Sequence, residues 1–320
     1  MQAVDEKVFP GCVVGIVREN GRQEILPFGK FTYETDAQDV QEDTVYDLAS
    51  VTKSVPVASL ALIYIGEGRM HITDTVKKYL PELQNDHDAT IEDLLRYRVS
   101  GPRLSTLRLE TFEEIRAHVL ESGFSGPPSV DAAYSNVPAY VLGIILERVG
   151  GGILPALADT YFFGPLGMHD TTFFPHDISR VAPTEVVDGK EVRGIVHDES
   201  ARVFSRARRA VGHAGLFSTA PDMLTFLDVL VSGDFAAVVQ GAQAGLGWQV
   251  CQPWFMGRLC GKHTFGKTGF TGTSLVCDVK RNIGFVILSN RTYPERPADA
   301  SSLTSAINRF RADIADIILG

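Results

Sequence analysis

The chain has 320 residues and a formal net charge of −9, with 44% hydrophobic and 22% charged residues. This size and composition are typical of a globular protein with one large domain or two interleaved domains. The acidic balance argues against a nucleic-acid partner, because nucleic-acid phosphates are bound by clustered Lys and Arg.

The N-terminal segment MQAVDEKVFPG has no basic region followed by an apolar one, so no signal peptide is predicted. The chain as written is therefore expected to be cytoplasmic, or secreted or periplasmic if a signal peptide has been removed. No apolar run reaches the roughly 20 residues that cross a membrane, so no membrane span is expected. We also expect a monomer or a weak dimer.

Two β-rich runs, 11–20 and 23–32, follow this segment. Asn20-Gly21 between them is a strong signal for a hairpin turn, which predicts antiparallel pairing.

The next run, from about Ser50 to Gly66, carries apolar residues at helical spacing and predicts a helix. Pro56 falls past the first turn of that helix. Because proline lacks an N–H and clashes with the preceding turn, we expect the helix to bend there.

From about residue 70 to residue 165 the pattern is mainly helical, and the region after it is rich in loops with short strand-like pieces. In chain order, the pattern predicts helices over 89–97, 111–122 and 137–150, strands over 171–175 and 184–194, a helix over 220–233, strands over 245–251, 273–279 and 283–290, and a last helix over about 299–319.

The order of strands, then helices, then strands with a helix predicts an α+β fold. We expect an antiparallel β-sheet flanked by helices, with an inserted mainly helical domain. The early and late strands are expected to join in one sheet. The predicted division assigns residues 1–66 and 222–320 to a split sheet domain, and residues 67–221 to the inserted domain.

The stretch GKHTFGKTGFTG, residues 261–272, has two interpretations. Gly261 to Thr268 matches the G-x-x-x-x-G-K-T pattern of phosphate-binding loops, so a P-loop nucleotide-binding protein is a remote alternative. Such a loop needs a helix directly after it, so that the helix N-terminus faces the phosphates. Here glycines and β-branched threonines follow, and they make a poor helix start.

The second interpretation is an acylation site, because Lys-Thr-Gly is also a signature of serine enzymes that attack β-lactams. Ser50-x-x-Lys53 is the only S-x-x-K in the chain, and its spacing places both side chains on one helix face. Tyr134-x-Asn136 is the only Y-x-N and lies just before a predicted helix. A serine hydroxyl is a poor nucleophile unless a nearby base takes its proton.

Lys53 can act as that base only as the neutral amine, so burial or a second cation must lower its pKa. Lys267 is the expected second cation. Tyr134 would gain from the same positive charge as a phenolate. The sequence allows either Lys53 or Tyr134 to be the base in acylation.

Together, and in this order, the three motifs resemble those of class C β-lactamases and related penicillin-binding-protein-like serine hydrolases. The similarity extends over almost the whole chain, including the stretches 162–173, 211–223 and 245–250. It implies the β-lactamase/transpeptidase-like fold and a serine hydrolase that forms an acyl-enzyme with a β-lactam, a D-alanyl peptide or a small ester. A small-molecule or short-peptide substrate is expected, and no cofactor. A penicillin-binding sensor that is acylated without turnover is an alternative.

We expect Ser50 to attack the carbonyl, while Lys53 and Tyr134 share the proton transfers. Tyr134 would protonate the leaving group and later activate water. The backbone N–H of Ser50 is one expected oxyanion donor, and the resemblance implies that of Phe270 as the other. The expected substrate-binding residues are Asn136, Lys267, Thr268 and Gly269.

Relatives usually carry His-Thr-Ser-Gly after a Leu-Leu pair, whereas this chain has Tyr97 and Arg98 there. His197-Asp198 could belong to a Ser-His-Asp triad, but the chain has no G-x-S-x-G elbow, so a loop hydrogen bond is predicted instead. His213 is expected to order a loop under the site.

The four cysteines, Cys12, Cys251, Cys260 and Cys277, are too few and too scattered for a disulfide framework. Cys251, Cys260 and His263 could be drawn as a metal site. The chain has no C-x-x-C pair, however, so no metal is expected and the cysteines are interpreted as free thiols.

Overall fold

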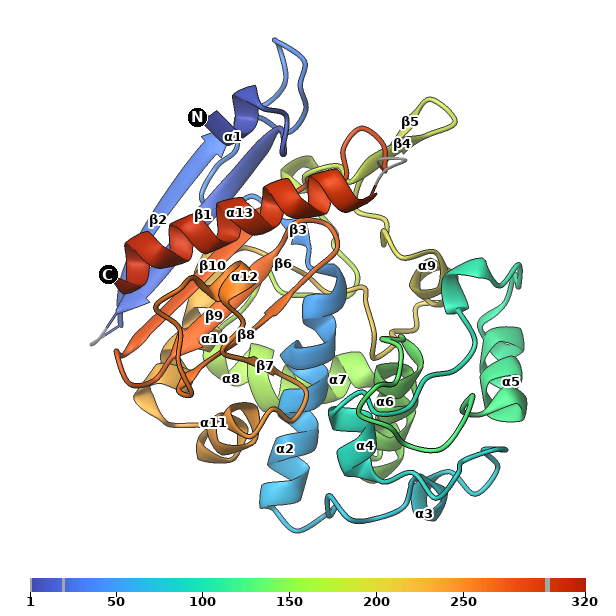
Figure 1. The fold of residues 1–320 in the computed structure, drawn as a ribbon. Coiled ribbons are helices and arrows are strands. Elements are labelled where there is room, and N and C mark those ends of the chain that lie inside the picture. The colour runs from blue at the N-terminus through green and yellow to red at the C-terminus, as the bar shows by residue number, and fades with distance from the viewer. Residues whose placement is uncertain (1, 19–20, 297–299) are drawn as a thin grey trace.

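The computed structural model describes residues 2–18, 21–296 and 300–320, and its centre is a six-stranded antiparallel sheet (Figure 1). The strand order is β2-β1-β10-β9-β8-β7. The strands are β1 (Gly11–Arg18), β2 (Arg22–Gly29), β7 (Gln249–Val250), β8 (Thr264–Thr268), β9 (Ser274–Asp278) and β10 (Ile283–Ser289). Two small pairs lie outside this sheet, namely β3 (Tyr46–Asp47) with β6 (Phe217–Ser218), and β4 (Glu185–Val187) with β5 (Lys190–Val192).

Helices cover both faces of the sheet, which confirms the predicted α+β class (Figure 1). One face carries α1 (Gln2–Asp5), α12 (Pro253–Met256) and α13 (Ala300–Leu319), and the other carries α10 (Ala220–Ser232) and α11 (Ala236–Gln243). The remaining α-helices are α2 (Ser59–Gly66), α3 (Val76–Tyr79), α4 (Ile91–Leu95), α5 (Phe112–Ser122), α6 (Val137–Gly150), α7 (Leu154–Ala158), α8 (Gly164–Leu166) and α9 (Glu199–Arg206). Short helical turns are η2 (Ala49–Lys53), η3 (Ser54–Ala58), η4 (Leu104–Thr106), η5 (Asp159–Phe163) and η6 (Ile178–Arg180).

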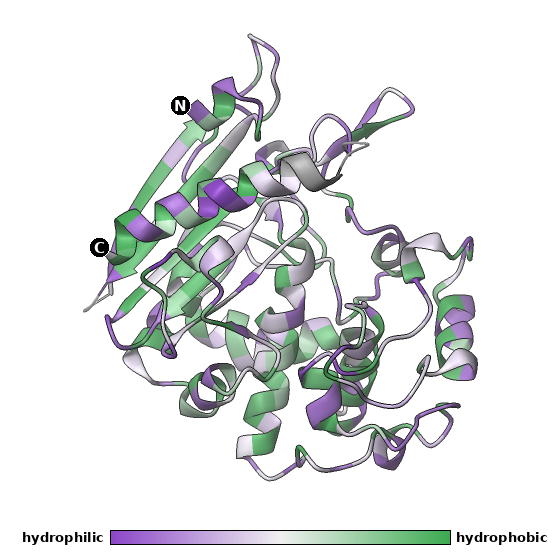
Figure 2. Cartoon of the chain, in the orientation of Figure 1, coloured by the Kyte–Doolittle hydropathy of each residue, from purple (hydrophilic) through white to green (hydrophobic). Residues whose placement is uncertain are grey.

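Strand β1 is buried on both of its faces, which explains its nearly continuous apolar sequence (Figure 2). Its alternate residues Cys12, Val14 and Ile16 pack in the cluster under α13, whereas Val13 and Val17 belong to the cluster that includes α10. This alternation fixes the register of the strand, because a shift by one residue would exchange the two faces.

The predicted union of early and late strands is confirmed, because β1 pairs with β2 on one side and with β10 on the other. Val14, for example, lies opposite both Leu26 and Ile287. The division into domains at residues 66 and 222 stays a prediction. One hydrophobic cluster of buried residues includes Val13 of the sheet and Ile145 of α6.

The segment Ala49–Gly66 is helical but not a single helix, as the position of Pro56 predicted. Val55 has φ −117° and ψ 110°, and it separates η2 from α2. The residue before a proline is sterically pushed out of the helical region, which accounts for this break.

Taken as one helical segment, Ala49–Gly66 is the one stretch among the described residues that is by itself long and apolar enough to cross a membrane. However, 78% of it is buried inside the molecule, as in the core helix of a globular protein. The bent pair Val137–Gly150 and Leu154–Leu166 passes the same test of length and composition only when taken together.

Most predicted elements are confirmed, but short strands are misassigned and the helices α7, α9, α11 and α12 are missing from the prediction. Residues 171–175 form no strand and contribute only an isolated bridge between Thr172 and Phe217. Strand β7 is limited to Gln249–Val250, and β8, whose sequence TFGKT lacks an apolar alternation, was not predicted from the pattern. The β1–β2 hairpin is present, but Asn20 of its predicted turn lies outside the described residues.

Candidate active site

Ser50 follows a sharp turn that the buried carboxylate of Asp47 holds in place. Ala49 has φ 46°, a left-handed conformation that a residue with a Cβ rarely adopts. Asp47 accepts hydrogen bonds from the N–H of Ala49 at 2.8 Å and from the N–H of His197 at 2.7 Å. Burial raises the pKa of Asp47 to about 6, against the opposing effect of these two bonds. The turn therefore places Ser50 at the surface of a cavity, while Asp47 and Ala49, which shape the turn, are buried.

Lys53 lies one turn after Ser50, and its amine donates to the Ser50 hydroxyl at 2.8 Å. The same amine donates to the backbone carbonyl of His213 at 2.7 Å. Burial lowers the pKa of Lys53 to about 7, although the negative charge of Asp198 opposes this shift. Near neutral pH a large fraction of Lys53 is thus the uncharged amine that the sequence argument required.

The role of Lys267 as a cation that lowers the pKa of Lys53 stays a prediction. Burial, not Lys267, is the main cause of the shift at Lys53. Lys267 is itself buried, and burial lowers its pKa, with a further lowering by Lys53 and an opposing effect of Tyr134. The two amines therefore share a site that already disfavours positive charge.

Tyr134 lies close to both of these amines, as the motif spacing alone could not show. The amine nitrogens of Lys53 and Lys267 are each 5.7 Å from the centre of the Tyr134 ring. The ring is more than half exposed and lines the cavity in front of Ser50. The three motifs predicted to meet are therefore gathered around one point of the structure.

Tyr97 is a neighbour of this cluster that the sequence showed only as a departure from the usual motif. Its ring lies 5.5 Å from the Tyr134 ring and 4.6 Å from the Lys267 amine. Tyr97 has φ 55°, and burial followed by the nearby Tyr134 raises the pKa of its hydroxyl well above the usual value. It covers Lys267 and contributes to the burial of that amine.

Lys267, Thr268 and Gly269 lie at the end of β8, where the chain turns into β9. A Cβ at position 269 would lie only 2.3 Å from the Leu48 carbonyl oxygen, so glycine permits the close approach of this turn to the segment before Ser50. Because a strand and not a helix follows, the P-loop interpretation is wrong.

Hydrogen bonds connect the turn between β8 and β9 to the segment before Ser50 and to Arg291. The hydroxyl of Thr271 donates to the Asp47 carbonyl at 2.6 Å, and that of Thr273 donates to the Leu48 carbonyl at 3.0 Å. Arg291 donates to the Phe270 carbonyl at 2.7 Å. The N–H of Phe270 has no acceptor within the described part of the chain, which leaves it free to donate to a ligand.

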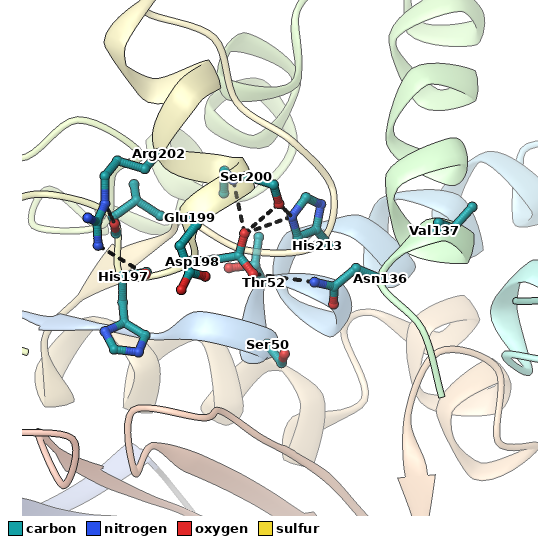
Figure 3. A network of polar contacts seen from close by, with 12 residues as sticks. Ser50, Thr52, Asn136, Val137, His197, Asp198, Glu199, Ser200, Arg202 and His213 are labelled. Carbon is teal, nitrogen blue, oxygen red and sulfur yellow. Dashed lines mark hydrogen bonds and ion pairs between the residues drawn. The ribbon is translucent and has the colours of Figure 1, made fainter. Parts of the chain in front are cut away.

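A polar network that includes Asp198 and His213 lies beside Ser50 (Figure 3). Nε2 of His213 is 3.2 Å from the Asp198 carboxylate and 3.0 Å from the Ser200 hydroxyl. Asn136 donates to the other oxygen of Asp198 at 3.3 Å. Burial would raise the pKa of Asp198, but His213 and the hydrogen bonds together hold it far below its usual value.

The contacts of His197 and His213 differ from each other. His197 and Asp198 form no His–Asp pair, and the His197 ring instead stacks on Phe270 with 5.7 Å between ring centres. His197 donates a loop hydrogen bond through its backbone N–H, as predicted, and burial lowers the pKa of its ring to about 4. His213 lies under the site as expected, where its carbonyl binds Lys53.

Asp198 is the residue whose role the sequence argument missed. Its carboxylate caps the N-terminus of α9 by accepting from the Ala201 N–H at 2.9 Å, and this local signal is visible in the sequence. Its contacts with Asn136 and His213 depend on segments more than ten residues away and carry no sequence signal.

Two hollows meet at Ser50, Tyr134 and Phe270, which line both. The larger, of about 650 Å³, lies between the 100–105 loop and the 197–199 segment and also includes Asn136. The smaller, of about 330 Å³, continues along the end of β8 towards α13, and its further lining residues include Trp254, Lys267, Thr268, Arg291, Asn308 and Arg311. A substrate carbonyl at Ser50 could thus extend one group into each hollow.

No group of three or more His, Cys, Asp or Glu able to hold a metal ion occurs among residues 2–18, 21–296 and 300–320.

Comparison with known proteins gives one family and one fold. The family model described as Beta-lactamase matches residues 2–306. The "Putative D-alanyl-D-alanine carboxypeptidase" of Escherichia coli (strain K12) is 29% identical over 309 residues, which cover 78% of this chain and 70% of that protein.

Among solved structures, the class C β-lactamase from Rhodobacter sphaeroides has a TM-score of 0.73 at 20% identity and covers 99% of this chain and 97% of its own. EstCE1, described as a hydrolase with promiscuous acyltransferase activity, has a TM-score of 0.75 at 22% identity, with 97% and 96% coverage. These two likenesses establish the predicted fold.

Proposed function

The chain belongs to the β-lactamase family and is a serine hydrolase of the β-lactamase and D-Ala-D-Ala peptidase type, and we propose that Ser50 is its nucleophile. The observation that carries this assignment is the 2.8 Å contact between the Ser50 hydroxyl and a lysine amine whose pKa is about 7. An amine with that pKa is a competent general base at neutral pH.

In the proposed acylation step, the Ser50 oxygen attacks the substrate carbonyl and its proton passes to Lys53. The contact between these two groups favours Lys53 over Tyr134 as the base in this step. The His213 carbonyl holds Lys53 in place and stabilises the ammonium that forms. The N–H groups of Ser50 and Phe270 would bind the developing oxyanion.

Tyr134 would then protonate the leaving group and later activate the water that releases the acyl group. The amines of Lys53 and Lys267 are each 5.7 Å from the centre of its ring, so groups that can exchange protons lie close to Tyr134. Turnover in this scheme needs Tyr134 in both half-reactions, whereas Lys53 acts mainly in the first.

The two hollows suggest how the substrate lies. A β-lactam or D-alanyl peptide carries a carboxylate on the leaving-group side, and Lys267 and Thr268 would bind it at the end of β8. The acyl side would then occupy the larger hollow, where Asn136 would hold its amide. Gly269 allows the backbone there to approach the substrate. A small ester would use the same nucleophile without the carboxylate contact.

The assignment is tested by Ser50→Ala with nitrocefin, p-nitrophenyl acetate and a D-Ala-D-Ala peptide as substrates. We expect kcat/KM to fall by at least about a thousandfold and covalent labelling by a fluorescent penicillin to disappear. Ser125→Ala, an exposed serine outside both hollows, is the matched control. Labelling of Ser50→Ala at the wild-type level would show that another residue is the nucleophile.

The same assay separates a hydrolase from a sensor that is acylated without turnover. A hydrolase gives steady product release over many turnovers, whereas a sensor gives one stoichiometric burst. Intact mass measured during the reaction shows which species accumulates.

A further inference from the structure

Two of the four cysteines lie next to each other in the structure, although nine positions separate them in the sequence. The sulfurs of Cys251 and Cys260 are 3.4 Å apart. Both residues are half-buried, whereas Cys12 and Cys277 are fully buried in the sheet core. The acylation chemistry of the site uses neither member of this pair.

The backbone on each side of the pair is anchored to the same residue at the start of β8. The N–H of Cys251 donates to the Thr264 carbonyl at 2.9 Å. Gly261, the residue after Cys260, donates its N–H to the Thr264 hydroxyl at 2.9 Å, and that hydroxyl donates to Asp278 at 2.7 Å. The proximity of the two sulfurs is thus fixed by the sheet.

From this arrangement we infer that Cys251 and Cys260 are a disulfide-forming pair, which a small-molecule disulfide such as oxidised glutathione converts by exchange. The sulfurs need to approach by only about 1.4 Å to reach the S–S bond length of about 2.05 Å. One protein thiolate attacks oxidised glutathione and releases one reduced glutathione. The second protein thiolate then attacks the mixed disulfide and releases another, so two protein thiols are oxidised and one glutathione disulfide is reduced.

Cys251 is the better first attacker. Burial and the adjacent Cys251 thiol raise the pKa of Cys260 to about 12, so the thiolate of Cys260 is scarce at neutral pH. Cys260 would therefore act second, as the residue that closes the protein disulfide.

The bond would close a ring around α12 and so affect a wall of the smaller hollow. Within this ring, Phe255 and Met256 are buried against α13, while the partly exposed Trp254 lines the hollow beside Lys267. The disulfide would therefore fix the position of Trp254 relative to the end of β8. This consequence for catalysis rests on the proposed function, but the chemistry of the thiols does not.

The test is to incubate the reduced protein with oxidised glutathione at pH 8, denature it, alkylate the free thiols and measure the intact mass. We expect wild type to lose two alkylatable thiols without retaining glutathione, with peptide mapping joining Cys251 to Cys260. Cys260→Ser should retain one glutathione on Cys251, and Cys251→Ser should form no disulfide within the protein. Four alkylatable thiols in wild type, a stable mixed disulfide, or a bond to Cys12 or Cys277 would overturn the inference.

Stability gives a second readout that does not depend on activity. Closing a loop of this length should raise Tm of the oxidised protein by roughly 3–6 °C, and dithiothreitol should reverse the rise. Cys251→Ala should show no such difference between oxidising and reducing conditions. If the disulfide forms fully but Tm is unchanged or lower, the native backbone does not accommodate the disulfide.

Catalysis is then compared between the oxidised and reduced wild type. We expect KM to change for a D-alanyl peptide, which reaches the smaller hollow, and to stay unchanged for p-nitrophenyl acetate. If the Ser50 assignment fails, neither substrate reports on the bond, but the mass and Tm outcomes still decide the inference.

Discussion

Lys53 combines full burial, a contact with Ser50 and a pKa of about 7, so its protonation state changes near neutral pH. The reactive form is the neutral amine, and its fraction grows as pH rises through that pKa. We expect kcat/KM to rise about tenfold per pH unit below pH 7 and to level off above it. A profile that is flat down to pH 5 would show that deprotonation of Lys53 does not limit kcat/KM in this pH range.

Replacing Lys53 by arginine keeps the charge but removes the base, because a guanidinium does not lose its proton in proteins. We expect Lys53→Arg to lower kcat by about 10²- to 10⁴-fold. Lys77→Arg, an exposed lysine paired with Asp86, is the control and should behave as wild type. Near-normal activity of Lys53→Arg would exclude Lys53 as the base.

Tyr134 is the second residue whose loss should be visible in turnover. Tyr134→Phe keeps the ring close to Lys53 and Lys267 and removes only the hydroxyl, so we expect kcat to fall by about 10²- to 10³-fold with little change in folding. The measurement is steady-state hydrolysis together with intact mass, and the control is Tyr33→Phe, because Tyr33 contacts Lys7 and lines neither hollow. Unchanged turnover would remove Tyr134 from the mechanism.

At the scale of elements, α9 is connected to the site through its N-cap residue, Asp198. Asp198 caps α9, pairs with His213 and contacts Asn136 at the start of α6, and its charge opposes the lowering of the Lys53 pKa (Figure 3). The Asp198 carboxylate thus contacts three segments, and its charge also raises the pKa of the proposed base, Lys53.

The Asp198→Asn variant separates these two effects. Without the negative charge the pKa of Lys53 should fall further, so the acid limb of the kcat/KM profile should move to lower pH. Tm should fall as well, because the buried pairing with His213 is weakened. Asp177→Asn, a cap on the exposed η6, controls for loss of a cap. A limb that moves to higher pH would contradict the electrostatic role.

For the whole molecule, the sheet and α10 must pack closely if the motif-bearing segments are to meet. A Cβ at position 284 of β10 would lie 2.8 Å from the Leu227 Cβ of α10 and 3.0 Å from Val17 of β1. Glycine at this position therefore allows the helix to lie directly on the sheet.

Gly284→Ala is expected to reduce the free energy of unfolding by about 1–3 kcal/mol through overpacking, measured by urea denaturation. Because this end of β10 is away from Ser50, the pH dependence of kcat/KM should not change. Gly126→Ala, where an added Cβ meets nothing within 4 Å, should change stability by less than about 0.5 kcal/mol. Equal stability of both variants would show that the packing there is loose.

Much of the fold was predictable from the sequence because it depends on local patterns. The bounds predicted for α6 agree with the structure, and α5 begins after Thr111, whose capping box with Glu114 is readable in the sequence. Strand β8 does not follow from the pattern, because Phe265 is the only apolar side chain among its buried residues and the others are threonine, glycine and lysine, so no apolar alternation marks it.

The sequence by itself determined that Ser50 and Lys53 lie one turn apart, since a spacing of three needs only local helical geometry. The tertiary structure alone decided that Lys53 is buried against the His213 carbonyl, that the amines of Lys53 and Lys267 both lie near the Tyr134 ring, and that burial lowers the pKa of Lys53 while Asp198 opposes this shift. A pKa depends on burial and on the charges within a few ångströms, and for Lys53 both come from segments more than 100 residues away.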